Sequence, residues 1–347
     1  MKIVITGGGT GGHLAIAKSL RDAALKEGYS CIYIGSTSGQ DRSWFAKEAT
    51  QADSEGSRGF SSVHFLHTRG VVNQKGLGKI FSLFLSLKAT VQALFLLRGS
   101  DCLISVGGFS AAPASFASIL LSKPFFIHEQ NAAIGRLNGL LRPYAKAFFS
   151  SYEKDSIVKD YPVRESFFEY ARERSKVQTI IFLGGSQGAR FINELAVKIA
   201  PLLHEKGTRI IHQAGRLEID KVKESYQDMG IEAEVFDFRP DIDALMQQSD
   251  LAVSRAGAST LWELCASALP ALYIPYPYAA GDHQFYNAEF LVQKKASWLC
   301  RQEDDPYTLL VELLEKDLRQ ESRNLQTLIH KNGAELIIKE VEKCLQS

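Results

Sequence analysis

Two short apolar runs that lead straight into glycine-rich turns constrain the fold of this chain more than any other feature. Residues 2–6 run into the glycines of residues 7–12, and residues 179–183 run into those of residues 184–188. Helical sequence follows each turn, so each motif predicts a strand, a tight turn and a helix. Glycine lets the backbone approach a ligand, and the next helix N-terminus offers N–H groups to phosphate. We therefore expect two Rossmann-like units and a ligand that carries a diphosphate.

Short β-rich runs alternate with helical stretches along the whole chain, which predicts an α/β protein with parallel sheets covered by helices. A chain of 347 residues exceeds the usual size of one core, so we expect two Rossmann-like domains that face each other across a cleft. We expect the domains at residues 1–160 and 161–330, and a last helix at 331–347 that packs back toward the first domain. The expected strands are residues 2–6, 31–34, 103–106, 125–127, 147–149, 179–183, 209–212, 234–236, 251–253 and 271–274.

The charge balance and the cysteines exclude several classes of protein. The formal net charge is +1, which offers no electrostatic footprint for a nucleic-acid binder. The five cysteines have no paired CxxC spacing, so neither a zinc site nor a disulfide framework is indicated. The N-terminus runs into a glycine turn rather than into a long apolar core, and we expect a cytoplasmic protein.

The first glycine turn also fits the spacing of dinucleotide-binding enzymes, because Gly7, Gly9 and Gly12 form G-x-G-x-x-G. An NAD enzyme should carry an acidic residue just after its second strand, whereas here Asp41 comes late. Sugar transfer is therefore favoured over hydride transfer. A tight turn without a ligand is the structural alternative, and in the second loop Ser186 could simply cap a helix.

Five motifs identify a family by their order and spacing. They are Gly8-Gly9-Thr10-Gly11-Gly12-His13, Ser105-Val106-Gly107-Gly108-Phe109, His128-Glu129-Gln130-Asn131, Gly184-Gly185-Ser186-Gln187-Gly188-Ala189-Arg190 and Ser254-Arg255-Ala256-Gly257-Ala258. With them the chain resembles the MurG family, within glycosyltransferase family 28, over nearly its whole length. The resemblance implies a GT-B fold, with the acceptor held mainly by the N-terminal domain and UDP-GlcNAc mainly by the C-terminal domain.

The resemblance also implies a reaction. GlcNAc would pass from UDP-GlcNAc to the C4 hydroxyl of MurNAc in lipid I, the undecaprenyl-pyrophosphoryl-MurNAc-pentapeptide, giving lipid II and UDP with inversion, as a step of peptidoglycan synthesis. No cofactor and no metal are implied. A related GT-B transferase with another lipid acceptor such as diacylglycerol, a UDP-sugar epimerase, and a nucleotide-binding module without turnover are the alternatives.

The residues that would bind the donor follow from the same resemblance. Glu263 would hold the ribose hydroxyls, since a carboxylate can accept two hydrogen bonds. Asn131 and Gln284 offer both a donor and an acceptor to sugar hydroxyls. Without the resemblance, Glu263 could be a solvated helix residue and Asn131 a helix cap. The other implied donor contacts are Thr10, Gly11, Gly12, Arg164, Ser186, Ala258, Ser259 and Thr260.

Inversion requires a base for the acceptor proton and stabilisation of the departing UDP. His13 is the first candidate, because it ends the first glycine loop and imidazole titrates near neutral pH. Binding of donor phosphate or closing of the loop is the alternative for His13, and Glu129 is the second candidate base. Asp241-Ile242-Asp243 resembles a metal-binding D-x-D, but we interpret Asp241 as a helix N-cap.

Residues 75–98 are rich in large apolar side chains, yet Lys88 lies at their centre. We therefore expect an interfacial or core helix and not a membrane span. The resemblance implies peripheral attachment to the cytoplasmic face of the inner membrane, with Lys75, Lys79 and Lys88 beside the apolar patch. The chain departs from the family pattern at residues 14–17, where a proline is usual, and at residues 238–240, which leaves the uracil contacts open.

Overall fold

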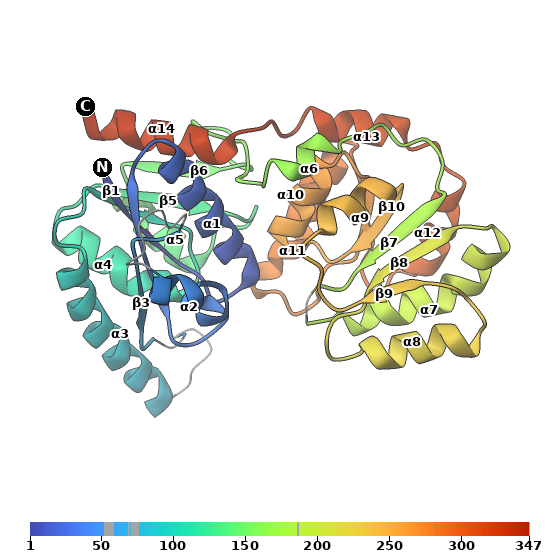
Figure 1. The fold of residues 1–347 in the computed structure, drawn as a ribbon, viewed down its shortest axis with the longest axis horizontal. Coiled ribbons are helices and arrows are strands. Elements are labelled where there is room, and N and C mark those ends of the chain that lie inside the picture. The colour runs from blue at the N-terminus through green and yellow to red at the C-terminus, as the bar shows by residue number, and fades with distance from the viewer. Residues whose placement is uncertain (52–58, 69, 71–75, 186, 347) are drawn as a thin grey trace. The chain divides into compact units, whose positions relative to one another are not determined.

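The computed structural model describes residues 1–51, 59–68, 70, 76–185 and 187–346. The chain divides into two compact units, Met1–Val163 with Asn332–Ser347 and Arg164–Lys331. Each unit contains one six-stranded sheet, and every pairing between strands is parallel. The predicted α/β class with two Rossmann-like domains is thus confirmed (Figure 1).

The first sheet has the order β3-β2-β1-β4-β5-β6. Its central strand β1 is apolar on both faces, with Ile3, Val4 and Ile5 fully buried, because helices cover both sides of a parallel sheet. Successive strands are added on one side of β1 up to β3 and on its other side from β4 on, and ligands bind parallel sheets beyond the carboxyl ends of the strands at such a switch point. The strands are β1 (Lys2–Thr6), β2 (Ser30–Ser36), β3 (Ser62–Leu66), β4 (Cys102–Ser105), β5 (Phe125–Glu129) and β6 (Ala147–Ser150).

The helices of the first unit include one from the far end of the chain. The C-terminal helix α14 packs on α1, and Lys26 forms an ion pair of 2.8 Å with Glu335 (Figure 1). Helices α3 and α4 also lie side by side. The helices are α1 (Gly11–Lys26), α2 (Asp41–Gln51), α3 (Leu77–Leu96), η1 (Phe109–Ala111), α4 (Ala112–Leu120), α5 (Arg136–Leu141), η2 (Arg142–Tyr144) and α14 (Gly333–Gln346).

The second sheet has the order β12-β11-β10-β7-β8-β9, so its switch point lies between β7 and β10. The strands are β7 (Thr179–Leu183), β8 (Arg209–Gln213), β9 (Glu234–Phe236), β10 (Leu251–Ser254), β11 (Ala271–Tyr273) and β12 (Trp298–Leu299). The helices are α6 (Ser166–Glu169), α7 (Arg190–Glu205), α8 (Ile219–Asp228), α9 (Ile242–Gln248), α10 (Ala258–Ala266), η3 (Ala280–Asp282), α11 (His283–Gln293), α12 (Pro306–Leu314) and α13 (Arg319–Gln326).

A fully buried arginine fixes two helices of this unit. The guanidinium of Arg174 donates to the carbonyls of Met246 and Ser249 at the end of α9, and to that of Ser267 at the end of α10. Helix C-termini carry partial negative charge and unpaired carbonyls, so they compensate a buried cation. The position of α10 matters for function because its other end faces the carboxyl edge of the sheet.

Candidate functional site

The first glycine loop packs backbone to backbone against a second glycine pair that follows β4. Gly7 has φ +119°, and a Cβ there would lie 2.4 Å from the carbonyl oxygen of Gly107. A Cβ on Gly108 would lie 2.2 Å from the carbonyl oxygen of Gly8. Only glycine fits at these positions. The two motifs therefore form one structure at the switch point of the first sheet.

The side chain of Asp41 fixes this glycine loop through hydrogen bonds. Its carboxylate is fully buried and accepts from the N–H of Gly9 at 2.7 Å, the N–H of Ser36 at 2.9 Å and the hydroxyl of Tyr33 at 3.0 Å. In a dinucleotide-binding enzyme the acidic residue binds the ribose hydroxyls of the cofactor. The carboxylate of Asp41 is instead engaged by donors of the protein itself. The carboxylate is thus a structural part of the loop.

His13 lies in the first turn of α1, next to the glycine loops. Its Nδ1 is 2.8 Å from the hydroxyl oxygen of Thr10. The amide nitrogen of Gln130 lies 2.9 Å from Nε2 and 3.3 Å from Nδ1. The lone pairs and N–H bonds of the two ring nitrogens point in different directions, so the amide nitrogen cannot be aligned with both. It lies close to the imidazole ring as a whole. A Cβ on Gly107 would come within 3.4 Å of Nε2, so glycine there leaves room beside the imidazole.

The carboxylate of Glu129, at the end of β5, is only 2% exposed and organises the loop that follows it. It accepts from the N–H of Asn131 at 2.9 Å, the N–H of Gly135 at 2.9 Å and the side-chain amide of Asn138 at 2.8 Å. Hydrogen bonds to a buried carboxylate are strong because they are charge-assisted. Helix α5 begins at Arg136 with Gly135 in its N-cap position, so Asn131 does not cap it.

His128 precedes this carboxylate and is fully enclosed. Burial, together with the smaller effect of the nearby charge of His13, lowers the pKa of His128 to about 3. Its ring meets that of Tyr161 edge-on, with 5.5 Å between the centroids. An imidazole with so low a pKa is neutral at physiological pH and a poor proton acceptor, so His128 is not a candidate base.

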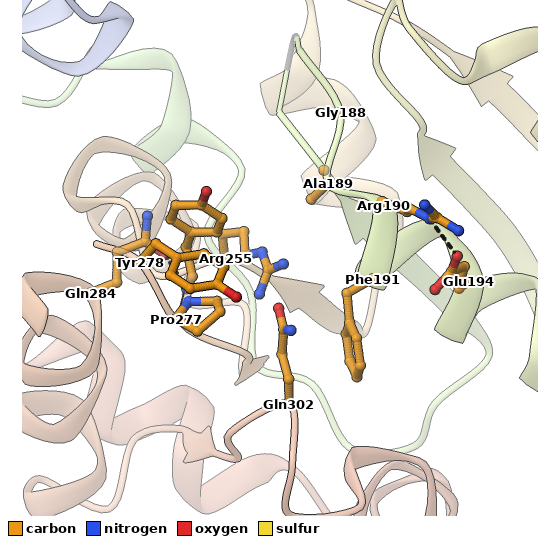
Figure 2. A pocket seen from close by; sticks show the side chains of 12 residues that line it. Gly188, Ala189, Arg190, Phe191, Glu194, Arg255, Pro277, Tyr278, Gln284 and Gln302 are labelled. Carbon is orange, nitrogen blue, oxygen red and sulfur yellow. Dashed lines mark hydrogen bonds and ion pairs between the residues drawn. The ribbon is translucent and has the colours of Figure 1, made fainter. Parts of the chain in front are cut away.

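The second unit contains a pocket of about 470 Å³ at the carboxyl ends of its strands. Figure 2 shows Pro277, Tyr278 and Gln284 along one wall and Phe191, Arg190 and Glu194 along the other, with Arg255 and Gln302 between them. Glycine is required here too, because a Cβ on Gly188 would lie 2.7 Å from a backbone oxygen. The lining residues are Gly184, Gly188, Ala189, Arg190, Phe191, Glu194, Arg255, Tyr276, Pro277, Tyr278, Gln284 and Gln302.

Arg255 brings a partly desolvated cation into this pocket. One Nη atom donates to the carbonyls of Ile274 and Pro275 at 2.9 Å each, and the guanidinium lies 5.7 Å from the ring centre of Tyr276. Burial lowers the pKa of Arg255 to about 10, so the group stays charged at neutral pH. A phosphate in the pocket would restore the charge compensation that water otherwise supplies.

Gln284 is oriented by the backbone beside it. Its amide oxygen accepts from the N–H of Tyr276 at 2.9 Å, so the amide NH₂ is the end that can donate to a ligand. The residue lies in the first turn of α11 and lines the pocket.

Glu263 lies on α10 in mostly protein surroundings but keeps partial access to solvent. Burial raises the pKa of its carboxyl group to about 7, although the positive charge of Arg164 opposes the shift. Within the described residues its carboxylate forms no hydrogen bond. A carboxylate in this state gains from a ligand that donates hydroxyl hydrogen bonds.

The first turn of α10 contains Ala258, Ser259 and Thr260, with Gly257 in the N-cap position and no side chain capping the helix. Helix N-termini without a side-chain cap present N–H groups and partial positive charge, which favours phosphate. Because Glu263 lies on the same helix, a nucleotide phosphate and a ribose could be held by one rigid element.

Comparison with known proteins identifies the family. Residues 3–150 match the glycosyltransferase family 28 N-terminal domain, and residues 179–341 match the glycosyltransferase family 28 C-terminal domain. The chain belongs to glycosyltransferase family 28. The resemblance found in the five motifs is thereby confirmed, and the protein is a glycosyltransferase.

Relatives of this family 28 chain carry the full name UDP-N-acetylglucosamine--N-acetylmuramyl-(pentapeptide) pyrophosphoryl-undecaprenol N-acetylglucosamine transferase. The protein of Sulfurovum sp. (strain NBC37-1) is 52% identical, with 97% of each chain covered. That of Wolinella succinogenes is 50% identical, over 96% of this chain and 98% of its own. The crystal structure of Acinetobacter baumannii MurG has a TM-score of 0.78 at 23% identity and 99% coverage of both chains, which shows the same GT-B fold.

The predicted site residues of this family 28 enzyme fall into two groups. Thr10, Gly11, Gly12, His13, Glu129 and Asn131 lie at the carboxyl edge of the first sheet. Arg164, Ala258, Ser259, Thr260, Glu263 and Gln284 belong to the second unit. Ser186 lies outside the described residues, and helix α7 has Ala189 in its N-cap position.

Sequence reasoning missed several side chains at these sites. Gln130 and Arg255 were within the quoted motifs, so polar residues flanking the glycines were an available signal. Asn138 and Gln302 follow no motif, and only folding brings them to their sites. Asp241 does occupy the N-cap position of α9, but its side chain does not cap the helix, because it accepts two hydrogen bonds from Arg239 instead.

Helix α3 shows a broad apolar face. No helix in the described ranges is long and apolar enough to cross a membrane. Lys88 is exposed on α3, while Lys75 lies outside the described residues and nothing is described of the side chain of Lys79. We call the exposed set on α3 and α4 the α3–α4 face. It comprises Phe81, Leu83, Phe84, Leu87, Val91, Phe95, Phe116, Leu120 and Leu121.

Proposed function

We propose that this chain transfers GlcNAc from UDP-GlcNAc to the C4 hydroxyl of MurNAc in lipid I, forming lipid II and UDP. The observation that carries the proposal is the pairing of His13 with paired glycine loops in one unit and a pocket with Arg255 and Gln284 in the other. The names of relatives about half identical over the whole chain support the same substrates. The acceptor of the transferred sugar is then a lipid-linked precursor of peptidoglycan.

The chemical step is a single displacement at the anomeric carbon of GlcNAc. The C4 oxygen of the acceptor forms the new bond, the bond from the anomeric carbon to the UDP oxygen breaks, and the configuration inverts. His13 takes the acceptor proton, and its Nδ1 contact with Thr10 orients the ring for this task. Glu129 is the second candidate base, but three N–H groups already engage its carboxylate, which favours His13.

The leaving UDP takes up the electron pair as negative charge. This charge is stabilised by the N–H groups at the first turn of α10, near Ala258, and by Arg164 and Arg255. Glu263 accepts the ribose hydroxyls, while Asn131 and Gln284 bind the sugar. The backbones of Thr10, Gly11 and Gly12 and the loop at Ser186 contribute further donor contacts. The chemistry needs no metal and no cofactor in this scheme.

The enzyme acts at the cytoplasmic face of the inner membrane as a peripheral protein, because its acceptor is a lipid. The α3–α4 face supports this, since Phe84, Leu87 and Leu120 are 63%, 64% and 69% exposed. Exposed apolar patches of this extent mark interaction surfaces. The exposed Lys88 beside them suits anionic headgroups.

One assay tests the proposal. UDP release is measured with a soluble lipid I analogue, with diacylglycerol and without acceptor, and the sugar product is analysed. Release that depends on the lipid I analogue is expected, and His13→Ala should lower turnover while leaving the affinity for UDP-GlcNAc nearly unchanged. Turnover only with diacylglycerol, or epimerisation of the sugar without transfer, would overturn the proposal. Normal turnover of His13→Ala at saturating substrates would overturn the role of His13.

A further inference from the structure

Gln302 brings an unsatisfied hydrogen-bond acceptor into the pocket of the second unit. Its Oε1 atom is buried, and in the described part of the chain no donor reaches it. Figure 2 shows the amide end of Gln302 directed into the pocket between its two walls. A buried acceptor without a donor costs free energy, so native proteins retain one mainly where a ligand or water satisfies it.

The loop that carries Gln302 is held firmly on both sides. Arg301 donates to Asp282 at 2.6 Å and stacks over the ring of Phe285 at 4.1 Å. On the other side Asp305 caps α12 through Thr308. Asp282 also precedes α11, the helix that carries Gln284. One ion pair therefore fixes Gln302 relative to Gln284.

The two amides offer complementary groups to a ligand. Gln284 uses its oxygen for a backbone N–H and can donate from its NH₂, whereas Gln302 presents an oxygen that can accept. A hydroxyl group both donates and accepts, so neighbouring sugar hydroxyls satisfy both amides. The rings of Tyr276 and Tyr278, 5.6 Å apart between centroids, add an apolar surface on which the C–H face of a pyranose can pack.

We propose that Gln302 binds the donor sugar by accepting a hydrogen bond from one of its hydroxyl groups. The inference rests on the proposed function, because it takes a UDP-linked sugar as the ligand of this pocket. It adds a residue from the β12–α12 loop to the site. The bond favours sugars with a hydroxyl at that position over analogues without one.

Calorimetry on the whole chain with two ligands tests this. Gln302→Met keeps the length of the side chain and removes the amide oxygen, and Gln293→Met, on the exposed end of α11, is the matched control. We expect Gln302→Met to bind UDP-GlcNAc about three- to tenfold more weakly and UDP with unchanged affinity. The control should bind both ligands as the parent does.

Retained UDP binding also shows that the variant is folded. Equal losses for UDP and UDP-GlcNAc would mean that Gln302 acts on the structure or on the nucleotide, and they would overturn the inference. Unchanged binding of both ligands would overturn it as well, with a pocket water then satisfying the oxygen. Failure of the proposed function shows in the acceptor assay instead, as the absence of transfer to the lipid I analogue, and a parent chain that binds neither ligand would contradict both proposals.

Discussion

The two units differ in how the carboxylates of their candidate sites are hydrogen-bonded. In the first unit, Glu129 accepts from two backbone N–H groups of the following loop and from the side-chain amide of Asn138 on α5, so it shapes the site before any ligand arrives. In the second unit, Glu263 lacks such partners among the described residues, and its pKa is raised to about 7 by burial. Gln302 repeats this pattern with an unpaired oxygen. The carboxylate of Glu129 is therefore preorganised, whereas the carboxylate of Glu263 and the oxygen of Gln302 depend on a ligand.

The largest effect is expected when the carboxylate of Glu129 is replaced by an amide. In Glu129→Gln the new NH₂ group must face at least one N–H that the carboxylate now accepts. One buried donor is left unpaired, and we expect a loss of about 2–3 kcal/mol in the free energy of unfolding. Urea unfolding at pH 7 measures it, with Glu263→Gln as the matched control, for which we expect no loss of stability, because burial already disfavours the charged form of Glu263. Equal stability losses would remove the distinction between the two units.

The apolar surface of the first unit gives a second test. Replacing Phe84 and Leu87 together by Asp removes two large apolar side chains from the α3–α4 face. Half-insertion of both would contribute about 2 kcal/mol, so binding to anionic liposomes should fall about thirtyfold. Leu217→Asp is the control, because Leu217 is an 81% exposed apolar residue in the second unit. Equal losses of liposome binding in the control and in the double variant, or no loss in the double variant, would contradict attachment by the first unit.

Glu263 provides the third test, on the ligand-dependent side of the comparison. Glu263→Gln keeps the shape of the side chain but weakens the acceptor for two ribose hydroxyls. Losing about 1.4 kcal/mol of charge-assisted hydrogen bonding would weaken binding of UDP-GlcNAc about tenfold. Calorimetry measures this, and 2′-deoxy-UDP-GlcNAc should show a smaller difference between variant and parent. An equal difference with both ligands would contradict contact with the ribose.

The sequence predicts the fold better than it predicts these roles. The central strands are continuous apolar runs, and the predicted segments correspond to strands in the structure. Strand β3 escaped prediction because it is an edge strand interrupted by Ser62 and His64, and β12 because it spans only two residues. Edge strands bury less and therefore carry a weaker hydrophobic signal.

The same limit applies to the site. Glycine motifs mark where a backbone can approach a ligand, and they predicted the two strand-turn-helix units. The partners of a carboxylate are set by loop geometry, which composition does not reveal. Asp41 illustrates this, because it looked misplaced for a ribose contact and instead holds Gly9. The oxygen of Gln302 is unpaired only because of how its loop folds.

The smallest expected effect concerns pH and distinguishes the two carboxylates in the native protein. Burial raises the pKa of Glu263 from 4.5 to about 7, so the folded protein retains this proton between those values. The stability contributed by this group is therefore largest below pH 4.5 and declines as the pH rises toward 7. Donor binding should show the opposite trend, because the ionised form is the better acceptor for ribose hydroxyls. We expect the affinity for UDP-GlcNAc to rise about fivefold from about pH 6 to about pH 8. In Glu263→Gln the affinity should stay nearly constant over this range, and a pH dependence that survives the substitution would assign the titration to another group.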